Sequence, residues 1–409
     1  MNTLKFAIVL MIAATLSGCS KVLDVEQPDT AFTRSLSKRV TASQTDFAFD
    51  LLKTVARDTN ETGNIFLSPI SASLALTMTM NGADGETWEE MRQTLGYDNA
   101  DREEINATCR ALIEELYSLC GDIEFNLAHS IWFNDNFTLQ DEFQRLNRDY
   151  FQAMIETLDF SRVDYCVNTI NSWVEAQTRD RIQDLVKPDD ISPLTMMLLI
   201  NAVYFKANWQ YQFDPEDTGQ DDFDLPDGSS LPCEMMKIKG KFDYYADDDL
   251  QAIDLPYANE HYSMTILLPK AGSTDSLLQR INQSDLNNIL GSMQQDSVNV
   301  FLPKFELEYE KSLVKALMNM GMIKAFGAAD FSRMFQEIKE GIFISEVRQK
   351  SFLKVEETGT EAAAATVVII KRSGVNDEIM MRIDHPFLLF IREKRSGTIL
   401  FCGKIIQPA

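Results

Sequence analysis

The sequence has few of the residues that enzymes use for catalysis, and it lacks their common motifs. It holds only three histidines, His129, His261 and His385, and each is isolated in the sequence. It contains no HExxH, no G-x-S-x-G, no phosphate-binding loop and no GxGxxG pattern. We therefore expect no catalytic residue, no metal site and no cofactor. Hydrolase activity is a hypothesis that no motif supports.

Cysteine is also scarce, and its placement excludes the usual cysteine chemistry. Beyond Cys19 the chain has Cys109, Cys120, Cys166, Cys233 and Cys402, an odd number whose spacing matches no metal or redox motif. Cys109 and Cys120 fall about three turns apart in a predicted helix, too far to bridge directly. We expect these cysteines to be small buried hydrophobic side chains.

Basic residues are outnumbered, with 38 Lys and Arg against 62 Asp and Glu, which gives a net charge of −24. This balance excludes a nucleic-acid partner, because phosphate binding needs a basic surface. A hydrophobic content of 45% is ordinary for a chain with a full core. No internal repeat and no Gly/Ser/Pro-rich linker divides residues 45–409, so these residues are predicted to form one large domain and a monomer.

The N-terminus has the pattern of a bacterial lipoprotein signal. Lys5 precedes a short apolar run over residues 6–16, which is too short to span a bilayer, and the run ends in Leu-Ser-Gly-Cys19. We expect residues 1–18 to be a signal peptide and residues 19–44 to be a polar tether lipidated at Cys19. No Asp follows Cys19, so we expect an outer-membrane or cell-surface location in a bacterial envelope. A plain secretory signal with a chance cysteine is the alternative.

The pattern of apolar residues predicts an α+β fold, with helices first and strands later. Helices are predicted at 47–55, after Pro69, and at 86–95, 102–119, 140–154 and 167–178, with strands at 64–67 and 125–133. From residue 194 the chain is strand-like, at 194–205, 231–246, 250–257, 262–269, 296–303, 342–355 and three times in 380–406, with helices near 275–290 and 309–320.

Residues 356–374 carry the most unusual pattern, because Ala362–Ala365 favour a helix whereas Val367–Ile370 favour a strand. Side chains in a strand alternate between its two faces. The even positions from Thr360 to Ile370 are uncharged and the first four are small, whereas Glu361 and Lys371 fall on the odd face. We infer that this segment can enter a sheet with its even face buried, and that Gly359 acts as the hinge. A surface helix or a low-complexity loop is the alternative.

Six blocks, in order along residues 45–409, resemble the serpin family. They are NIFLSPIS (64–71), NAVYFKANW (201–209), FLPKF (301–305), ADFS (329–332), ETGTEAAAA (357–365) and MRIDHPFLLFI (381–391). The resemblance implies helices around a large mixed central sheet, further smaller sheets, and an exposed reactive-centre loop at about 357–378.

The resemblance further implies a suicide inhibitor of proteases. A protease cleaves the loop, remains attached as an acyl-enzyme, and is displaced when the loop inserts into the sheet as a new strand. The implied loop hinge comprises Glu357, Gly359, Thr360, Ala362, Ala363, Ala364, Ala365 and Thr366. The implied sheet-opening residues are Ser68, Ser71, Asn201, Trp209 and Gln349, where Gln349 stands in place of the histidine that the family often has.

The cleaved bond is predicted within residues 371–375. Arg372 suits the carboxylate-lined pocket of a trypsin-like protease, so Arg372-Ser373 is the preferred bond. Counting along the family pattern instead gives Ser373-Gly374 or Val375, and Lys371 is a further candidate. Val368, Ile370 and Ser373 also suit elastase-like, subtilisin-like or some cysteine proteases. The alternative function is a non-inhibitory binding protein with the serpin fold.

Overall fold

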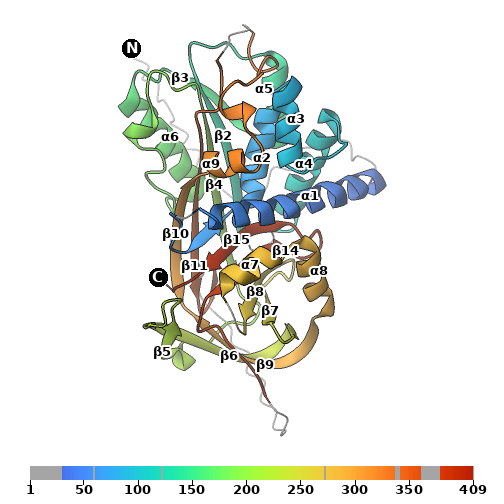
Figure 1. The fold of residues 1–409 in the computed structure, drawn as a ribbon, viewed down its shortest axis with the longest axis vertical. Coiled ribbons are helices and arrows are strands. Elements are labelled where there is room, and N and C mark those ends of the chain that lie inside the picture. Colours follow the sequence, from blue (N-terminus) through green and yellow to red (C-terminus); the bar gives the residue numbers. More distant parts are fainter. Residues whose placement is uncertain are drawn as a thin grey trace, which may run out of the picture.

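The computed structural model describes residues 30–408 apart from residues 59, 121–122, 271–272, 337–340 and 361–377, with side chains from residue 42 onward. Helices prevail in the first half of the chain and strands in the second, which confirms the predicted α+β fold (Figure 1). The helices are α1 (Thr30–Ala56), α2 (Pro69–Met80), α3 (Gly85–Thr94), α4 (Arg102–Ser118), α5 (Asp141–Phe151), α6 (Val163–Thr178), α7 (Thr274–Arg280), α8 (Gln283–Ser292) and α9 (Val314–Asn319).

One sheet is mixed and has six strands in the order β10-β11-β12-β4-β2-β3. Strand β11 pairs with β4 in parallel, and β2 pairs with β3 in parallel, whereas the other neighbours are antiparallel. The strands are β2 (Glu124–Asn134), β3 (Met154–Leu158), β4 (Met197–Asn208), β10 (Phe305–Ser312), β11 (Glu346–Glu356) and β12 (Gly359–Thr360).

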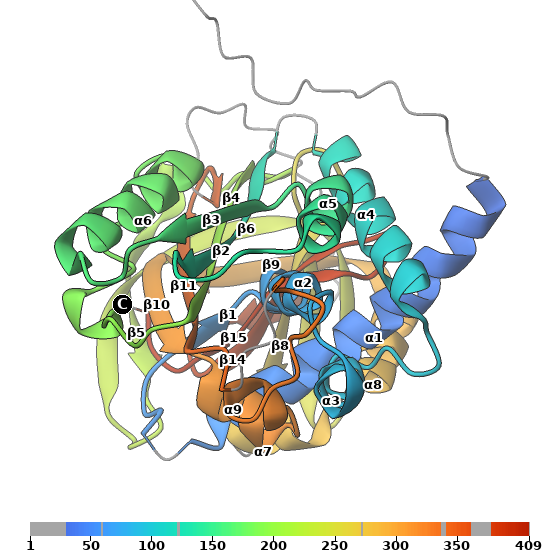
Figure 2. The same cartoon turned by 90° about the horizontal axis from the view of Figure 1, so that it is seen from above.

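Strand β4 is apolar along nearly its whole length because both of its faces are covered. Leu198 and Ile200 pack with α6 residues on one face, whereas Leu199 and Val203 belong to the main core on the other. Figures 1 and 2 show α6 on one side of this sheet and α2, α4 and α5 on the opposite side. The sheet is therefore held between two helical layers.

Helix α2 lies at the centre of the molecule (Figure 2), and each of its residues from Pro69 to Met80 is buried. A helix that is apolar all round is expected in such a position. Pro69 begins the helix, where its missing N–H is not needed. The buried hydroxyls of Thr77 and Thr79 donate to the carbonyls of Ser73 and Ala75, so these polar groups are satisfied within the helix.

The second sheet has nine strands, because the long β6 joins groups of strands that the sequence indicated as separate smaller sheets. One part of β6 pairs with β5, its middle with β9, and its end with β7. The order is β1-β15-β14-β8-β7-β6-β9-β13, with β5 also on β6. The strands are β1 (Ile65–Leu67), β5 (Gly219–Asp224), β6 (Ser230–Ala246), β7 (Leu250–Pro256), β8 (Tyr262–Pro269), β9 (Gln294–Pro303), β13 (Ile379–Arg382), β14 (Phe387–Glu393) and β15 (Ile399–Ile405).

Several predicted boundaries are wrong. Residues 309–312 continue strand β10, and only 314–319 form a helix. The reason is that Phe305, Leu307 and Tyr309 alternate with polar residues along β10, which pairs with β11 up to Ser312. The helix predicted near 275–290 is two helices, α7 and α8, divided at Asn282, whose side chain caps α8. Strands β3 and β5 were not predicted.

The N-terminal helix also begins earlier than the sequence suggested. Helix α1 begins at Thr30, within the stretch predicted to be a tether, and Ser43 donates to the carbonyl oxygen of Gly96 at 2.7 Å. The packed part of the chain thus includes residues ahead of position 45. The five cysteines beyond Cys19 are buried, as expected of small hydrophobic side chains.

Candidate functional site

The segment after β11 turns back and enters the six-stranded sheet. Strand β12 lies between β11 and β4, and it is antiparallel to both. Gly359 pairs with Glu356 and Asn208, whereas Thr360 pairs with Val355 and Ala207. Beyond β12, strands β11 and β4 pair directly with each other, from Glu346–Leu198 to Ser351–Val203. The first residues of the predicted hinge therefore already occupy the position of an added strand.

Gly359 is required at the entry to the sheet because its backbone lies against β4. A Cβ atom on Gly359 would lie 2.2 Å from the carbonyl oxygen of Ala207 and 2.6 Å from Cα of Asn208. Thr360 is 1% exposed, and its hydroxyl is 2.8 Å from the hydroxyl of Tyr257. The small uncharged side chain that sequence parity assigned to the buried face is thus buried in this structure.

Trp209 fixes the turn between β11 and β12. Its indole Nε1 donates to the carbonyl of Glu356 at 3.0 Å, and its backbone N–H donates to the carbonyl of Thr358 at 3.0 Å. Its ring stacks on Tyr257 with ring centroids 4.8 Å apart and planes 5° apart. The same tyrosine bonds Thr360, so Trp209 and Tyr257 together hold both ends of the turn.

Glu357, at the tip of this turn, is held by two neighbouring side chains. Its carboxylate accepts from the Thr218 hydroxyl at 2.9 Å and pairs with the Lys304 ammonium at 3.2 Å. Desolvation raises the pKa of Glu357, but its own backbone N–H, Thr218 and Lys304 together outweigh this effect. The pKa therefore lies below its ordinary value, and the ion pair favours the charged form.

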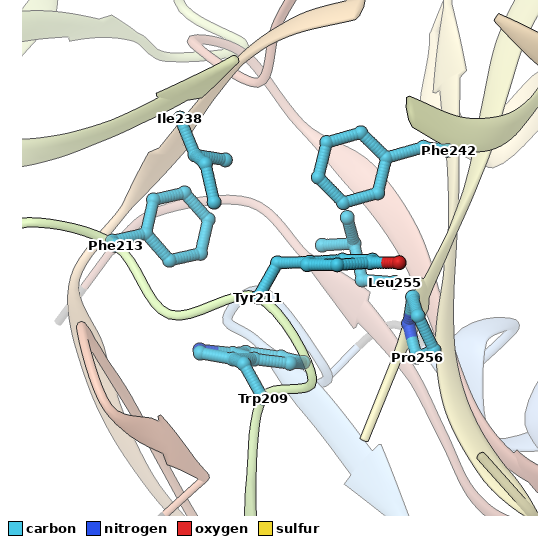
Figure 3. Close-up of a pocket in the computed structure, with 7 residues that line it drawn as sticks. All are labelled: Trp209, Tyr211, Phe213, Ile238, Phe242, Leu255 and Pro256. Carbon is cyan, nitrogen blue, oxygen red and sulfur yellow. The ribbon is translucent and has the colours of Figure 1, made fainter. Parts of the chain in front are cut away.

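Aromatic side chains fill the space beside Trp209 (Figure 3). A cavity of about 10 Å³ remains there, close to the smallest volume that holds one water molecule. It is lined by Trp209, Tyr211, Phe213, Ile238, Phe242, Leu255 and Pro256. The cavity is too small for an organic ligand, so this cluster serves to pack the turn onto strand β6.

The other predicted sheet-opening residues meet where β11 and β4 pair directly. Gln349 accepts from the backbone N–H of Ser68 at 2.9 Å and donates to the Ser68 carbonyl at 2.8 Å. Ser71 donates to Oδ1 of Asn201 at 3.3 Å, and Asn201 pairs in register with Gln349. We call Ser68, Ser71, Asn201 and Gln349 the opening cluster. It joins the start of α2 to both strands of this direct pairing.

His129, which is isolated in the sequence, also belongs to this site. It pairs with Asn201 across β2 and β4, and its Nδ1 lies 3.3 Å from Oδ1 of Asn201. Its Nε2 has no partner among the described residues, nor do Nδ2 of Asn201 and the hydroxyl of Ser351. The sequence carries one indication of this role, because His129 interrupts the apolar strand face formed by Leu127 and Ile131.

Burial lowers the pKa of His129 to about 4, although the hydrogen bond with Asn201 raises it. The folded protein therefore holds this imidazole neutral throughout the range in which an exposed histidine titrates. His385 has the opposite environment. Its Nδ1 lies 2.9 Å from Asp384 and its Nε2 lies 2.8 Å from the Pro269 carbonyl, so both ring nitrogens are engaged.

Several predicted residues lie outside the described residues. They are Cys19, Ala362, Ala363, Ala364, Ala365, Thr366, Lys371, Arg372, Ser373, Gly374 and Val375. Their roles remain predictions from the sequence. Within the described ranges, no helix is long and apolar enough to cross a membrane, and no group of three or more His, Cys, Asp or Glu could hold a metal ion.

Comparison with known proteins agrees with this geometry. The family model described as "Serpin (serine protease inhibitor)" matches residues 42–408. An uncharacterized serpin-like protein of Thermococcus kodakarensis is 37% identical over 376 residues, covering 91% of this chain and 86% of its own. The thermophilic serpin tengpin, solved in its native state, has a TM-score of 0.83 at 28% identity and covers 94% of this chain and 96% of its own. Human thyroxine-binding globulin, solved in complex with thyroxine, has a TM-score of 0.83 at 26% identity and covers 91% of this chain and 100% of its own.

Gly359→Ala is expected to displace β12 from the sheet, because a β-carbon cannot fit against the Ala207 carbonyl. We expect a loss of about 2 kcal/mol in the free energy of unfolding, measured by urea denaturation. Gly219→Ala is the matched control, since Gly219 also lies in a strand but has open space at its Cβ position. Equal stability of the two variants would contradict the close approach.

His129→Asn is expected to flatten the dependence of stability on pH. The folded pKa is about 4 and the ordinary value is 6.5, so between these values the unfolded chain binds a proton that the folded chain rejects. The wild-type protein should lose stability as the pH falls from 6.5 to 4, by about 2–3 kcal/mol in all. Urea midpoints measured across this range test the difference between the two proteins.

The control for this experiment is His261→Asn, because His261 is an exposed histidine. This variant should keep the wild-type slope. His385 is the third histidine, and its hydrogen bond to Asp384 raises its pKa. It therefore makes the protein less stable as the pH rises above 6.5, which is the opposite sign to His129. Wild type and both variants keep His385, so its effect cancels in the comparison. An unchanged slope in His129→Asn would show that the buried imidazole does not govern acid sensitivity.

Proposed function

The chain belongs to the serpin family, and we propose that it inhibits its target proteases as a suicide substrate. The family and the fold support protease inhibition in general. The observation that carries the finer proposal is strand β12, which lies between β11 and β4 and is antiparallel to both. A loop that begins in this position extends the sheet if the following residues continue in the same direction.

The proposed reaction begins with ordinary acyl transfer. The hydroxyl of the protease serine attacks the carbonyl carbon of Arg372, and the bond to the Ser373 nitrogen breaks. Arg372 is then esterified to the protease, and the Ser373 nitrogen leaves as an amine that takes up a proton. The freed segment continues from Thr360 into the sheet, and the protease is carried with it before water can hydrolyse the ester.

Insertion is favourable because it replaces one ladder of hydrogen bonds by two. The direct parallel pairing of 346–351 with 198–203 must open. An inserted strand then pairs with both neighbours in the antiparallel manner, which is slightly more stable per residue. About a dozen additional backbone hydrogen bonds at about 1 kcal/mol each give on the order of 10 kcal/mol, and burial of Val368 and Ile370 adds to this.

A trypsin-like protease is the proposed target class, because Arg372 matches a specificity pocket that holds a carboxylate. Elastase-like, subtilisin-like and some cysteine proteases are further candidates, because the uncharged residues Val368, Ile370 and Ser373 suit their pockets. This choice rests on the sequence, because residues 361–377 lie outside the described structure. The proposed location, a bacterial envelope with a lipid at Cys19, likewise rests on the sequence pattern.

A binding protein without inhibitory activity is the second candidate, because human thyroxine-binding globulin has a very similar fold. The small residues of the predicted hinge and the buried Thr360 favour the inhibitor instead. Hydrolase activity has no support from the described histidines. His129 is buried beside Asn201, and both ring nitrogens of His385 are already engaged.

The chain from residue 20 onward, mixed with trypsin, should give a covalent complex that survives boiling and migrates at the summed mass on a denaturing gel. Arg372→Ala should slow complex formation with trypsin by about a hundredfold or more, because the basic residue in the specificity pocket is lost. Lys371→Ala is the matched control and should have a small effect. Clean loop cleavage with full residual trypsin activity would contradict inhibition, and a dominant effect of Lys371→Ala would move the cleaved bond.

Thr360→Arg should convert the inhibitor into a substrate, because it places a guanidinium at the buried position beside Tyr257. The variant should be cleaved by trypsin and release it active. Thr360→Val replaces the hydroxyl by a methyl group of similar size and should still form the complex. The ratio of complex to cleaved protein on the gel measures the effect, and an equal ratio in Thr360→Arg and wild type is the outcome that the proposed insertion forbids.

A further inference from the structure

Strand β6 presents a row of three exposed lysines on a protein that is strongly acidic overall. Lys237, Lys239 and Lys241 alternate with Ile238 and Gly240, and the pairing of β6 with β9 has no register shift over this stretch. Their side chains therefore leave the same face of the sheet, roughly 7 Å apart. The opposite face of β6 carries Ile238, which packs towards Trp209 (Figure 3).

The strands beside β6 complete this face with a mixed surface. The backbone pairing places Phe301 between Lys237 and Arg382, and Asn299 between Lys239 and Met380. Met380 is 52% exposed, and the Arg382 guanidinium lies 4.8 Å from the centre of the Phe301 ring. We call this surface the lysine face. It is defined by Lys237, Lys239, Lys241, Phe301, Met380 and Arg382.

Neighbouring carboxylates balance the positive charge of the lysine face only in part. Among the described carboxylates, none forms an ion pair with Lys237 or Lys241, whereas Lys239 pairs with Glu378. Arg382 is bound by Asp221 and Asp384. The acidic strand β5 pairs with β6 only as far as Gly219 and Met235, so this pairing stops before Lys237. A cationic strip with an exposed methionine beside it therefore remains open to a partner.

The lysine face adjoins the point where the chain leaves the reactive-centre loop. Strand β13 begins at Ile379, directly after that segment, and pairs in parallel with β9. Glu378, the residue before it, binds both Lys239 and Asn299. The face and the exit of the loop are thus one continuous surface, on strands that Figure 1 shows at one end of the molecule.

We propose that the lysine face is a docking surface for an acidic patch on the target protease, beside its active site. This inference rests on the proposed function. A protease bound at Arg372 must cover the residues that follow the cleaved bond, and these lead directly into Glu378 and β13. Complementary charge at such a position speeds association and adds to selectivity between proteases that share one cleavage preference.

A protease surface fits the lysine face better than a polyanion does. Phe301 and Met380 give the face an apolar part, and charged borders around an apolar centre are typical of protein interfaces. A polyanion gains from cationic groups alone. The continuity with the loop also brings a protease to this face without any further binding event.

The test compares two trypsin isoforms that share a preference for Arg but differ in surface charge, anionic trypsin and cationic trypsin. The variant Lys237→Gln/Lys239→Gln/Lys241→Gln should associate about tenfold more slowly with anionic trypsin at low ionic strength. The loss should shrink at about 0.3 M salt, where charges are screened. The rate with cationic trypsin should change little.

The control Lys187→Gln/Lys315→Gln/Lys324→Gln removes the same number of charges from exposed lysines on other elements. It should leave both rates within about twofold, as expected for charges remote from the contact. Equal losses in the two triple variants, or equal losses with the two isoforms, would overturn the proposal. Retention of the wild-type protein on immobilised heparin that is lost in the variant, with unchanged protease rates, would assign the face to a polyanion and also overturn it.

Binding to an anionic trypsin whose catalytic serine is replaced by alanine separates this inference from the proposed function. If no covalent complex forms with active trypsin but binding to the inert trypsin weakens in the lysine variant, docking stands and suicide inhibition falls. If a complex forms at equal rates in both proteins and inert trypsin binds them equally, suicide inhibition stands and the docking surface falls.

Discussion

The direct parallel pairing of β11 with β4 is the contact on which the rest of the structure depends. It joins residues 346–351 to 198–203, and beyond it the same two strands already accept β12 between them. Parallel ladders are slightly less stable per residue than antiparallel ones. A sheet that keeps two parallel neighbours where an antiparallel strand can enter has a more stable arrangement within reach. This difference is the source of the free energy that the proposed insertion would release once the loop is cut.

Two groups of residues control that contact from its two ends. Trp209 and Tyr257 hold the turn where β12 enters, so the start of insertion is already organised. At the other end, the opening cluster and His129 leave buried polar atoms without partners in the described structure. Such partly satisfied groups lower the stability of the closed sheet.

Much of the fold could be predicted because the apolar patterns are strong and local. The buried strand after residue 194 and the helix after Pro69 are examples, since each has a long apolar run. The start of the helix predicted near 309–320 could not be placed, because the strand character of residues 309–312 depends on pairing with β11.

The site shows the same division between local and distant causes. The alternation of side chains along the strand correctly assigns Thr360 to a buried face. Its present burial, however, depends on pairing with Ala207 and on contact with Tyr257, which are both distant in the sequence. The role of His129 was missed for the same reason, because Asn201 becomes its neighbour only through the pairing of β2 with β4.

Strand β6 lies between the predicted hinge and the lysine face. Its inner face, with Ile238 and Phe242, packs beside Trp209 at the hinge, whereas its outer face carries the lysines. It pairs with β9 from Met235 to Tyr244, and with β5 and β7 at its two ends. In the proposed mechanism a protease docks on this strand, whereas the loop enters the other sheet between β11 and β4. On this proposal, recognition and trapping depend on different residues, so the affinity for a target can change at positions 237, 239 and 241 without any change in the strand that enters the sheet.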